Sequence, residues 1–166
     1  MIHWLVLGGV LLAAAVTDIR YGKVYNSLTY PAAIAGVLYH ALSPVGLGLT
    51  AAAAGAAAGG GVLFLFYVYR IVNGGDVKLM AAVGAWCGTP MIWDCLVAAC
   101  FAGAALSVLR LVASGRFLVG LRAIGLSMAS AFVPGLKAHV HPSGVSVPFA
   151  VAISIGTASV IAMRVL

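Results

Sequence analysis

The chain has 166 residues, of which 64% are hydrophobic and only 7% are charged, and its formal net charge is +6. Soluble domains carry about a quarter charged residues, so this sequence cannot cover a globular domain with a polar, water-exposed surface. The basic residues stand singly and form no patch, which excludes the usual electrostatic footprint of a nucleic-acid-binding protein. The composition therefore indicates an all-α protein embedded in a lipid bilayer.

Apolar segments long enough for membrane spans follow one another along the chain. Turn-forming residues separate some of them, as at Ser43-Pro44 and Thr89-Pro90. We expect a single transmembrane domain of about six helices, at residues 2–17, 28–42, 47–69, 77–88, 91–112 and 147–163.

The third expected span, residues 47–69, is unusually rich in alanine and glycine. Small residues let helix backbones approach closely in lipid, so we expect this helix to pack at the centre of the bundle. Residues 113–146 place basic residues, prolines and glycines around apolar pieces. We expect a cytoplasmic loop there with an interfacial amphipathic helix, and whether residues 123–136 are interfacial or membrane-embedded stays open.

The positions of the positive charges predict the orientation. No basic residue precedes the first apolar run, whereas Arg20 and Lys23 follow it. This favours a retained first span, with the N-terminus outside, over a cleaved signal peptide. In that orientation eight of the nine Lys and Arg residues fall on the cytoplasmic side and only Arg164 falls outside, in agreement with the positive-inside rule.

The acidic residues number only three, all of them aspartates. The expected topology places Asp18 at the end of the first span and Asp76 at the start of the fourth, both at the cytoplasmic surface, with Asp94 on the opposite side. A carboxylate beside hydrocarbon is costly and indicates a function. Two carboxylates within a few ångströms share a proton and can hold a water between them. Such a pair can activate that water against a peptide carbonyl by general acid–base catalysis, without a metal or a cofactor.

Other roles for these aspartates remain open. Asp76 could cap the helix that it opens, and Asp18 could pair with Arg20 or Lys23. A second functional hypothesis is a small ion- or proton-coupled transporter, in which Asp18 and Asp76 are the ion or proton sites. Against it, both lie near one surface and no internal repeat is visible. For Asp94 we expect a structural role.

The sequence offers no pattern typical of a metal site. Its three cysteines, Cys87, Cys95 and Cys100, form no CxxC pair, and His139 and His141 have no third ligand nearby in the sequence. We therefore expect neither a structural zinc nor a catalytic metal.

Three segments of the sequence stand out, namely DIRYGKVYN at 18–26, GDVKL at 75–79 and VPFAVAI at 147–153. Together they resemble the type IV prepilin peptidase family. Residues 18–26 (DIRYGKVYN) resemble its first active-site segment. Residues 75–79 (GDVKL), followed by AAVG at 81–84, resemble its Gly-x-Gly-Asp motif and the helix that the motif opens. Residues 147–153 (VPFAVAI) are similar to its last helix. The resemblance extends over most of the chain.

Two positions depart from the family pattern. Asn73 stands where the first glycine of Gly-x-Gly-Asp is usual, and Tyr25 replaces the common proline before Asn26. Neither departure removes a carboxylate.

The resemblance implies an intramembrane-type aspartyl endopeptidase with Asp18 and Asp76 as its catalytic pair and no cofactor. Its substrate would be a prepilin, cut between a short basic leader and an apolar helix at the cytoplasmic face of the bacterial inner membrane. Larger members carry paired CxxC motifs associated with zinc and N-methylation, which this sequence lacks. The chain thus resembles the short branch that serves Flp-type pili, and no N-methyltransferase activity is expected.

Five further residues are expected to support the pair. Gly74 and Gly75 would admit an extended substrate backbone and let the helix start move. Asn26 would order the loop after Asp18. Lys78 would face away from Asp76 and meet a carboxylate or a lipid phosphate. Lys23, in the segment that follows Asp18, is the fifth residue expected to support the pair.

Overall fold

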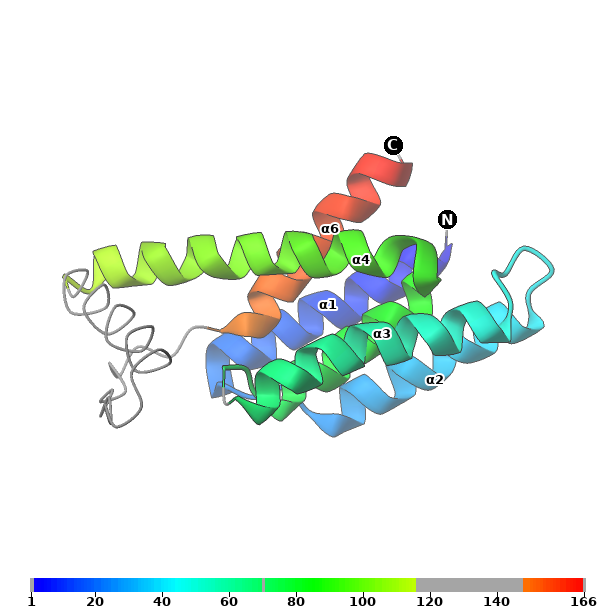
Figure 1. The fold of residues 1–166 in the computed structure, drawn as a ribbon, viewed down its shortest axis with the longest axis horizontal. Helices are drawn as coiled ribbons and strands as arrows, with labels where there is room; N and C mark the ends of the chain where they lie inside the picture. The colour runs from blue at the N-terminus through cyan, green and yellow to red at the C-terminus, as the bar shows by residue number, and fades with distance from the viewer. Residues whose placement is uncertain (1, 70, 116–147, 166) are drawn as a thin grey trace, which may run out of the picture. The chain divides into compact units, whose positions relative to one another are not determined.

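The computed structural model describes residues 2–69, 71–115 and 148–165. Throughout these ranges the regular structure is α-helical, without a strand, which confirms the all-α class (Figure 1). The helices are α1 (Ile2–Tyr21), α2 (Asn26–Leu42), α3 (Leu49–Val68), α4 (Gly74–Ala113) and α6 (Phe149–Val165). Most of the expected loop at 113–146, with its interfacial helix, lies outside the described residues.

The chain divides into two compact units, and the site lies in the first. That unit comprises Met1–Gly103 together with Pro148–Leu166, and the second comprises Ala104–Val147. In the second unit the described residues are the end of α4 and the turn after it, where the Ser114 hydroxyl donates to the carbonyl of Leu111 over 3.0 Å.

Three of the described helices, α1, α3 and α4, are long and apolar enough to cross a membrane. Helices α2 and α6 are shorter, with 17 residues each. Large apolar side chains are exposed on several helices, as at Leu5, Leu65 and Phe101. Such surfaces suit contact with lipid. The full number of spans and the outside N-terminus stay predictions.

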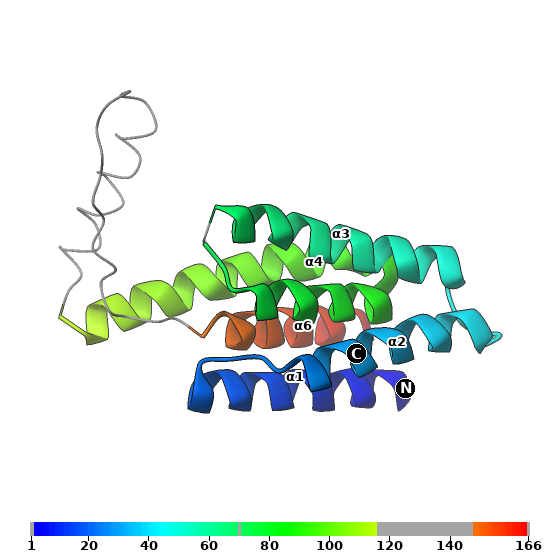
Figure 2. The same cartoon turned by 90° about the horizontal axis from the view of Figure 1, so that it is seen from below.

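Helix α4 contains both the fourth and the fifth expected spans, because it bends sharply at Gly88. Gly88 has φ 64° and ψ −177°, a conformation that side chains with a Cβ rarely adopt, and Pro90 follows it. The bend divides α4 into a first arm, residues 74–88, and a second arm, residues 89–113 (Figure 2). The Sγ atoms of Cys87 and Cys95 are 3.9 Å apart, whereas eight residues span about 12 Å along a straight helix. The two arms therefore fold back on each other next to the bend.

Glycines bring the backbones of α3 and the first arm into direct contact. A Cβ built on Gly84 would lie 2.1 Å from the carbonyl oxygen of Gly55, and one built on Gly55 would lie 2.4 Å from that of Gly84. Gly59 lies equally close, since its Cβ would lie 2.7 Å from the carbonyl oxygen of Met80. This is the close approach that small residues permit between helices in a membrane.

The expectation that α3 lies at the centre of the bundle was wrong, because the first arm of α4 holds that place. Helix α3 buries only one stripe of residues, namely Ala52, Gly55, Gly59 and Leu63. Every residue from Ala82 to Gly88 in the first arm is buried. Small residues allow a close approach on one face, but they give α3 little side-chain surface with which to bind neighbours on its other faces.

A chain of buried hydrogen bonds joins α2 to the first arm. The indole Nε1 of Trp86 donates to the carbonyl of Ala32 over 2.8 Å, and Nε2 of His40 lies 2.8 Å from the carbonyl of Trp86. The amide of Leu47 donates to Nδ1 of His40 over 3.1 Å. Since Nδ1 accepts, Nε2 carries the proton and donates to Trp86. His40 thus fixes the end of α2 and the following loop against α4.

Helix α6 packs against α1 and the second arm. The Ser154 hydroxyl donates to the carbonyl of Leu11 in α1 over 2.9 Å. A Cβ on Gly156 would lie 2.5 Å from the amide nitrogen of Ala99. Near the other end of α6, Arg164 forms a half-exposed ion pair with Asp94. Asp94 therefore has the structural role expected of it, as a link between α4 and α6.

We predict that Gly84→Ala destabilises the fold by about 1–3 kcal/mol, because the added methyl overlaps the backbone of Gly55 and the helices must separate. The measurement is the free energy of unfolding in detergent micelles. Gly61→Ala is the matched control in α3, since a Cβ there would meet nothing within 4 Å. We expect it to be neutral or slightly stabilising. Equal stability of Gly84→Ala and the wild type would contradict the close helix contact.

Candidate active site

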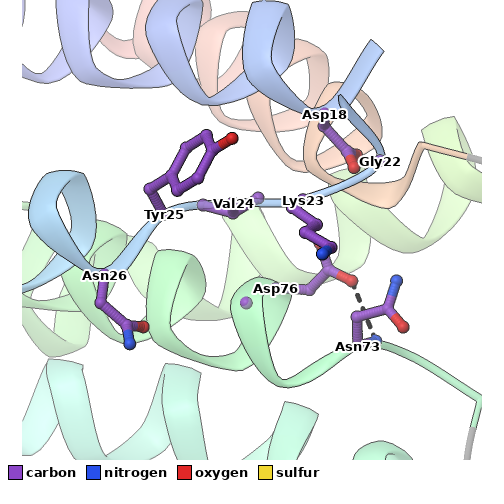
Figure 3. A pocket seen from close by; sticks show the side chains of 9 residues that line it. Asp18, Gly22, Lys23, Val24, Tyr25, Asn26, Asn73 and Asp76 are labelled. Atoms are coloured by element: carbon purple, nitrogen blue, oxygen red, sulfur yellow. Dashed lines mark hydrogen bonds between the residues drawn. The ribbon is translucent and has the colours of Figure 1, made fainter. Parts of the chain in front are cut away.

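A cavity of about 380 Å³ lies where α1 ends and where α2 and α4 begin (Figure 3). Its volume has room for several water molecules, each of which occupies about 30 Å³ in the liquid. It is lined by residues from the end of α1, from the loop after it and from the start of α4, namely Asp18, Gly22, Lys23, Val24, Tyr25, Asn26, Asn73, Gly75 and Asp76. Both aspartates singled out in the sequence thus reach one cavity.

Of the five residues expected to support the pair, Lys23, Asn26 and Gly75 line this cavity. Gly74 and Lys78 do not belong to its lining. The sequence reasoning gave no role to Gly22 or Val24. Gly22 has φ 63°, in the left-handed region that favours glycine, so it turns the chain directly after α1. Its place after a predicted helix end was the signal that could have found it.

Asp76 lies in the first turn of α4 and is almost completely buried, with 2% of its surface exposed. Helix α4 begins at Gly74, three residues before the expected start, so Asp76 belongs to the helix itself. Its Oδ2 accepts a hydrogen bond from the amide of Asn73 over 3.0 Å. This is the backward contact of a capping box, in which a side chain of the first turn binds the amide just before the helix. The capping role foreseen for Asp76 is therefore real, and the same side chain also faces the cavity.

Asp18 lies near the C-terminal end of α1 and is also buried, with 7% of its surface exposed. Its Oδ2 accepts a hydrogen bond from the amide of Ala150 over 2.9 Å. Ala150 is in the first turn of α6, 132 residues further along the chain. Asp18 therefore bonds across the fold to a helix start that nothing in its local sequence indicated.

The two carboxylates belong to the lining of one cavity. Figure 3 shows them entering the same region from different elements, Asp18 from α1 and Asp76 from α4, with the loop of Lys23 beside them. Each is held through its Oδ2 by a main-chain amide. Two oriented carboxylates on a cavity with room for several waters can exchange protons with a bound water and with a peptide group.

Gly75 lets the loop after α1 approach the start of α4. A Cβ on Gly75 would lie 3.1 Å from Cβ of Val24 and 3.3 Å from its carbonyl oxygen. At Gly74 the nearest side chain is the ring of Tyr67, at an ordinary contact distance of 3.5 Å. The close neighbour of Gly75 is thus the chain's own loop, and the approach of a substrate backbone to these glycines stays a prediction.

Lys78 bonds to Asn26 instead of to the expected carboxylate or lipid phosphate. Its ammonium donates to Oδ1 of Asn26 over 2.8 Å and lies 5.1 Å from the centre of the Tyr30 ring. The reason is that Asn26 opens α2 next to the first turn of α4. The bond ties Asn26, at the end of the loop that lines the cavity, to α4. An ordering role of the Asn26 side chain within the loop after Asp18 stays a prediction.

Within the described ranges, no group of three or more His, Cys, Asp or Glu side chains is placed to hold a metal ion. The free thiols Cys87 and Cys95 are buried next to the bend in α4, and Cys100 is exposed on the second arm.

The sequence profile of the type IV leader peptidase family matches residues 5–108, more than half of the chain. The chain belongs to this family. The match covers both aspartates and the loop between α1 and α2. A transporter is accordingly not favoured.

Curated relatives carry the name prepilin leader peptidase/N-methyltransferase. One from Burkholderia pseudomallei (strain 1026b) is 36% identical over 104 residues, which are 59% of this chain and 34% of that protein. One from Xanthomonas campestris pv. campestris is 32% identical over 118 residues, which are 68% of this chain and 41% of that protein. The chain thus spans little more than a third of the length of the relatives that it matches. No solved structure matches the chain.

We predict that Lys78 and Asn26 stabilise the fold jointly. In a double-mutant cycle with Lys78→Met and Asn26→Ala, the free energies of unfolding should be non-additive by about 0.5–1.5 kcal/mol, the usual net value of one hydrogen bond. As a control, Lys78→Met combined with Asp94→Asn should be additive, because no contact joins those sites. Additive behaviour of Lys78 and Asn26 would contradict a bond between them.

Proposed function

We propose that this chain is an aspartyl endopeptidase that removes the leader of a prepilin, with Asp18 and Asp76 as its catalytic pair. One observation carries the proposal: two buried carboxylates, from α1 and from α4, line the same cavity in a member of the type IV leader peptidase family. Buried carboxylates are costly in a membrane protein, and a shared catalytic cavity is a reason to retain them.

The proposed reaction is a hydrolysis by a water held between the carboxylates. The ionised carboxylate takes a proton from this water while the water oxygen attacks the carbonyl carbon of the scissile peptide. The protonated carboxylate donates its proton to the carbonyl oxygen, and a tetrahedral diol forms. When the diol collapses, the C–N bond breaks and the leaving nitrogen takes the proton that the first carboxylate had accepted from the water. The other carboxylate takes a proton from a diol hydroxyl, which gives the new carboxyl terminus and restores the pair. The hydrogen bonds to both Oδ2 atoms keep the carboxylates oriented through these steps.

The proposed substrate is a prepilin of the Flp type, with a short basic leader before an apolar helix and the cut next to a glycine. The cavity lies at one end of the helices, where a substrate helix lodged in the bilayer would present its leader junction. The names of the curated relatives support a prepilin substrate. Those names also include N-methyltransferase, and the carboxylate pair accounts for the hydrolysis alone, so we propose no methyl transfer for this chain.

The proposed location is the bacterial inner membrane, with the N-terminus outside and the cavity at the cytoplasmic face. Arg20 lies in the last turn of α1, Lys23 in the loop that lines the cavity, and Lys78 near the start of α4. Arg164 lies in the last turn of α6, at the opposite end of that helix from Ala150. This distribution follows the positive-inside rule.

We predict that two cysteines, introduced one at a time into a Cys100→Ala background, are labelled from opposite sides of the membrane. Lys23→Cys lies at the cavity, and Val45→Cys lies in the loop between α2 and α3, where Val45 is 81% exposed. A membrane-impermeant maleimide added to intact spheroplasts should label Val45→Cys at once and Lys23→Cys only after the membrane is opened. The reverse pattern would place the cavity outside and overturn the proposed orientation.

We predict that Asp18→Asn and Asp76→Asn each lower the cleavage of a co-expressed Flp-type prepilin by roughly 100- to 10,000-fold, because each removes one acid–base group. Asp18→Glu and Asp76→Glu should also fail, since the extra methylene displaces the carboxylate. Asp94→Asn is the matched control and should cleave normally, because its ion pair with Arg164 is half exposed and contributes little. Normal cleavage by both dyad variants would exclude the proposed function.

A further inference from the structure

The position of Asp18 within its own helix is unfavourable for a carboxylate. It lies in the last turn of α1, which ends at Tyr21, where the free backbone carbonyls give the helix end a partial negative charge. Asp76 is in the opposite situation, since the first turn of α4 offers it free amides and the positive end of a helix. The start of α4 therefore stabilises a negative charge on Asp76, whereas the end of α1 disfavours one on Asp18.

Helix α6 supplies a hydrogen-bond donor to Asp18, which the C-terminal end of α1 does not offer. The amide of Ala150, in the first turn of α6, donates to Oδ2 of Asp18 over 2.9 Å. Ala150 is completely buried, so water does not compete for this bond. The start of α6 thus places a hydrogen-bond donor and the positive end of a helix against the carboxylate.

The packing of α6 fixes the place of this amide. The Ser154 hydroxyl, one turn further along, lies 2.9 Å from the carbonyl of Leu11 and 2.8 Å from that of Ala150, and these two acceptors share its one proton. A Cβ on Gly103 would lie 2.7 Å from the ring of Phe149, so this ring packs directly on the second arm. The amide therefore cannot shift along α1 without breaking a hydrogen bond and a tight contact.

We propose that the main-chain amide of Ala150 is a positioning group for Asp18 in the reaction. It holds the carboxylate turned toward the cavity and stabilises its charge, as the amide of Asn73 does for Asp76. This inference rests on the proposed peptidase function. Ala150 lies beyond residues 5–108, the part of the chain that the family profile matches.

The test replaces the single N–H by an oxygen. Lactic acid, introduced at position 150 by nonsense suppression, turns the amide into an ester that cannot donate and leaves the methyl side chain unchanged. The matched control carries the α-hydroxy acid of valine at position 151, whose amide donates to the carbonyl of Pro148 over 3.2 Å instead of to Asp18. Both esters remove one hydrogen bond from the same turn of α6.

The readouts are kcat and KM for a synthetic prepilin peptide with a basic leader, a glycine at the junction and an apolar helix, together with the midpoint of thermal unfolding. We expect the ester at 150 to lower kcat per folded enzyme by roughly 10- to 100-fold, the range for a hydrogen bond to a charged group, with KM unchanged. The ester at 151 should show similar unfolding and a kcat within about twofold of the wild type.

Two results would overturn the inference. One is wild-type kcat for the ester at 150, whether or not KM rises, and the other is an equal fall in kcat for both esters. Failure of the unmodified protein to cleave the peptide would instead count against the proposed function itself, so the two failures are distinguishable.

Discussion

The direct backbone contact between α3 and the first arm of α4 is the constraint on which the rest of the fold depends. Gly55 and Gly84 let the two helices approach so closely that neither position has room for a Cβ. The first arm is thereby held at the centre, and α2 bonds to it through Trp86 and His40. The bend at Gly88 then returns the chain along the same core. Because Asp76 lies in the first turn of this arm, the packing of small residues far from the cavity determines where one carboxylate lies.

Each of the two carboxylates accepts a hydrogen bond from a main-chain amide, but one amide is near in the sequence and the other is distant. Asp76 is served by the amide of Asn73, three residues earlier, so its support is local and belongs to one helix start. Asp18 lies at a helix end that repels negative charge, and the opening amide of α6 compensates for this. Each aspartate therefore meets one main-chain donor at the start of a helix. This common feature orients both buried acids of the cavity by backbone groups.

The features that could be predicted from the sequence depend on composition and on local pattern. The all-α class follows from the apolar composition, and the place of Asp18 and Asp76 at one level of the fold follows from their positions at helix ends. The capping role of Asp76 was also accessible, since it depends on a neighbour three residues away. The central place of the first arm was not accessible, because the many alanines of α3 suggested contact on every side. The partners of Asp18 and Lys78 were missed because they are distant in the sequence. Ala150 is 132 residues from Asp18, and Asn26 is 52 residues from Lys78. The partner at Ala150 is in addition a backbone amide, which every residue except proline has, so the residue type gives no indication of it.

The long separation between Asp18 and Ala150 has a consequence for biosynthesis. A ribosome makes α1 first and α6 last, and Asp18 enters the membrane long before its amide partner is translated. A nascent chain that has inserted α1 to α4 already contains every residue that lines the cavity, but it lacks the amide of Ala150. The order of synthesis thus delays this hydrogen bond to Asp18 until α6 has docked against α1.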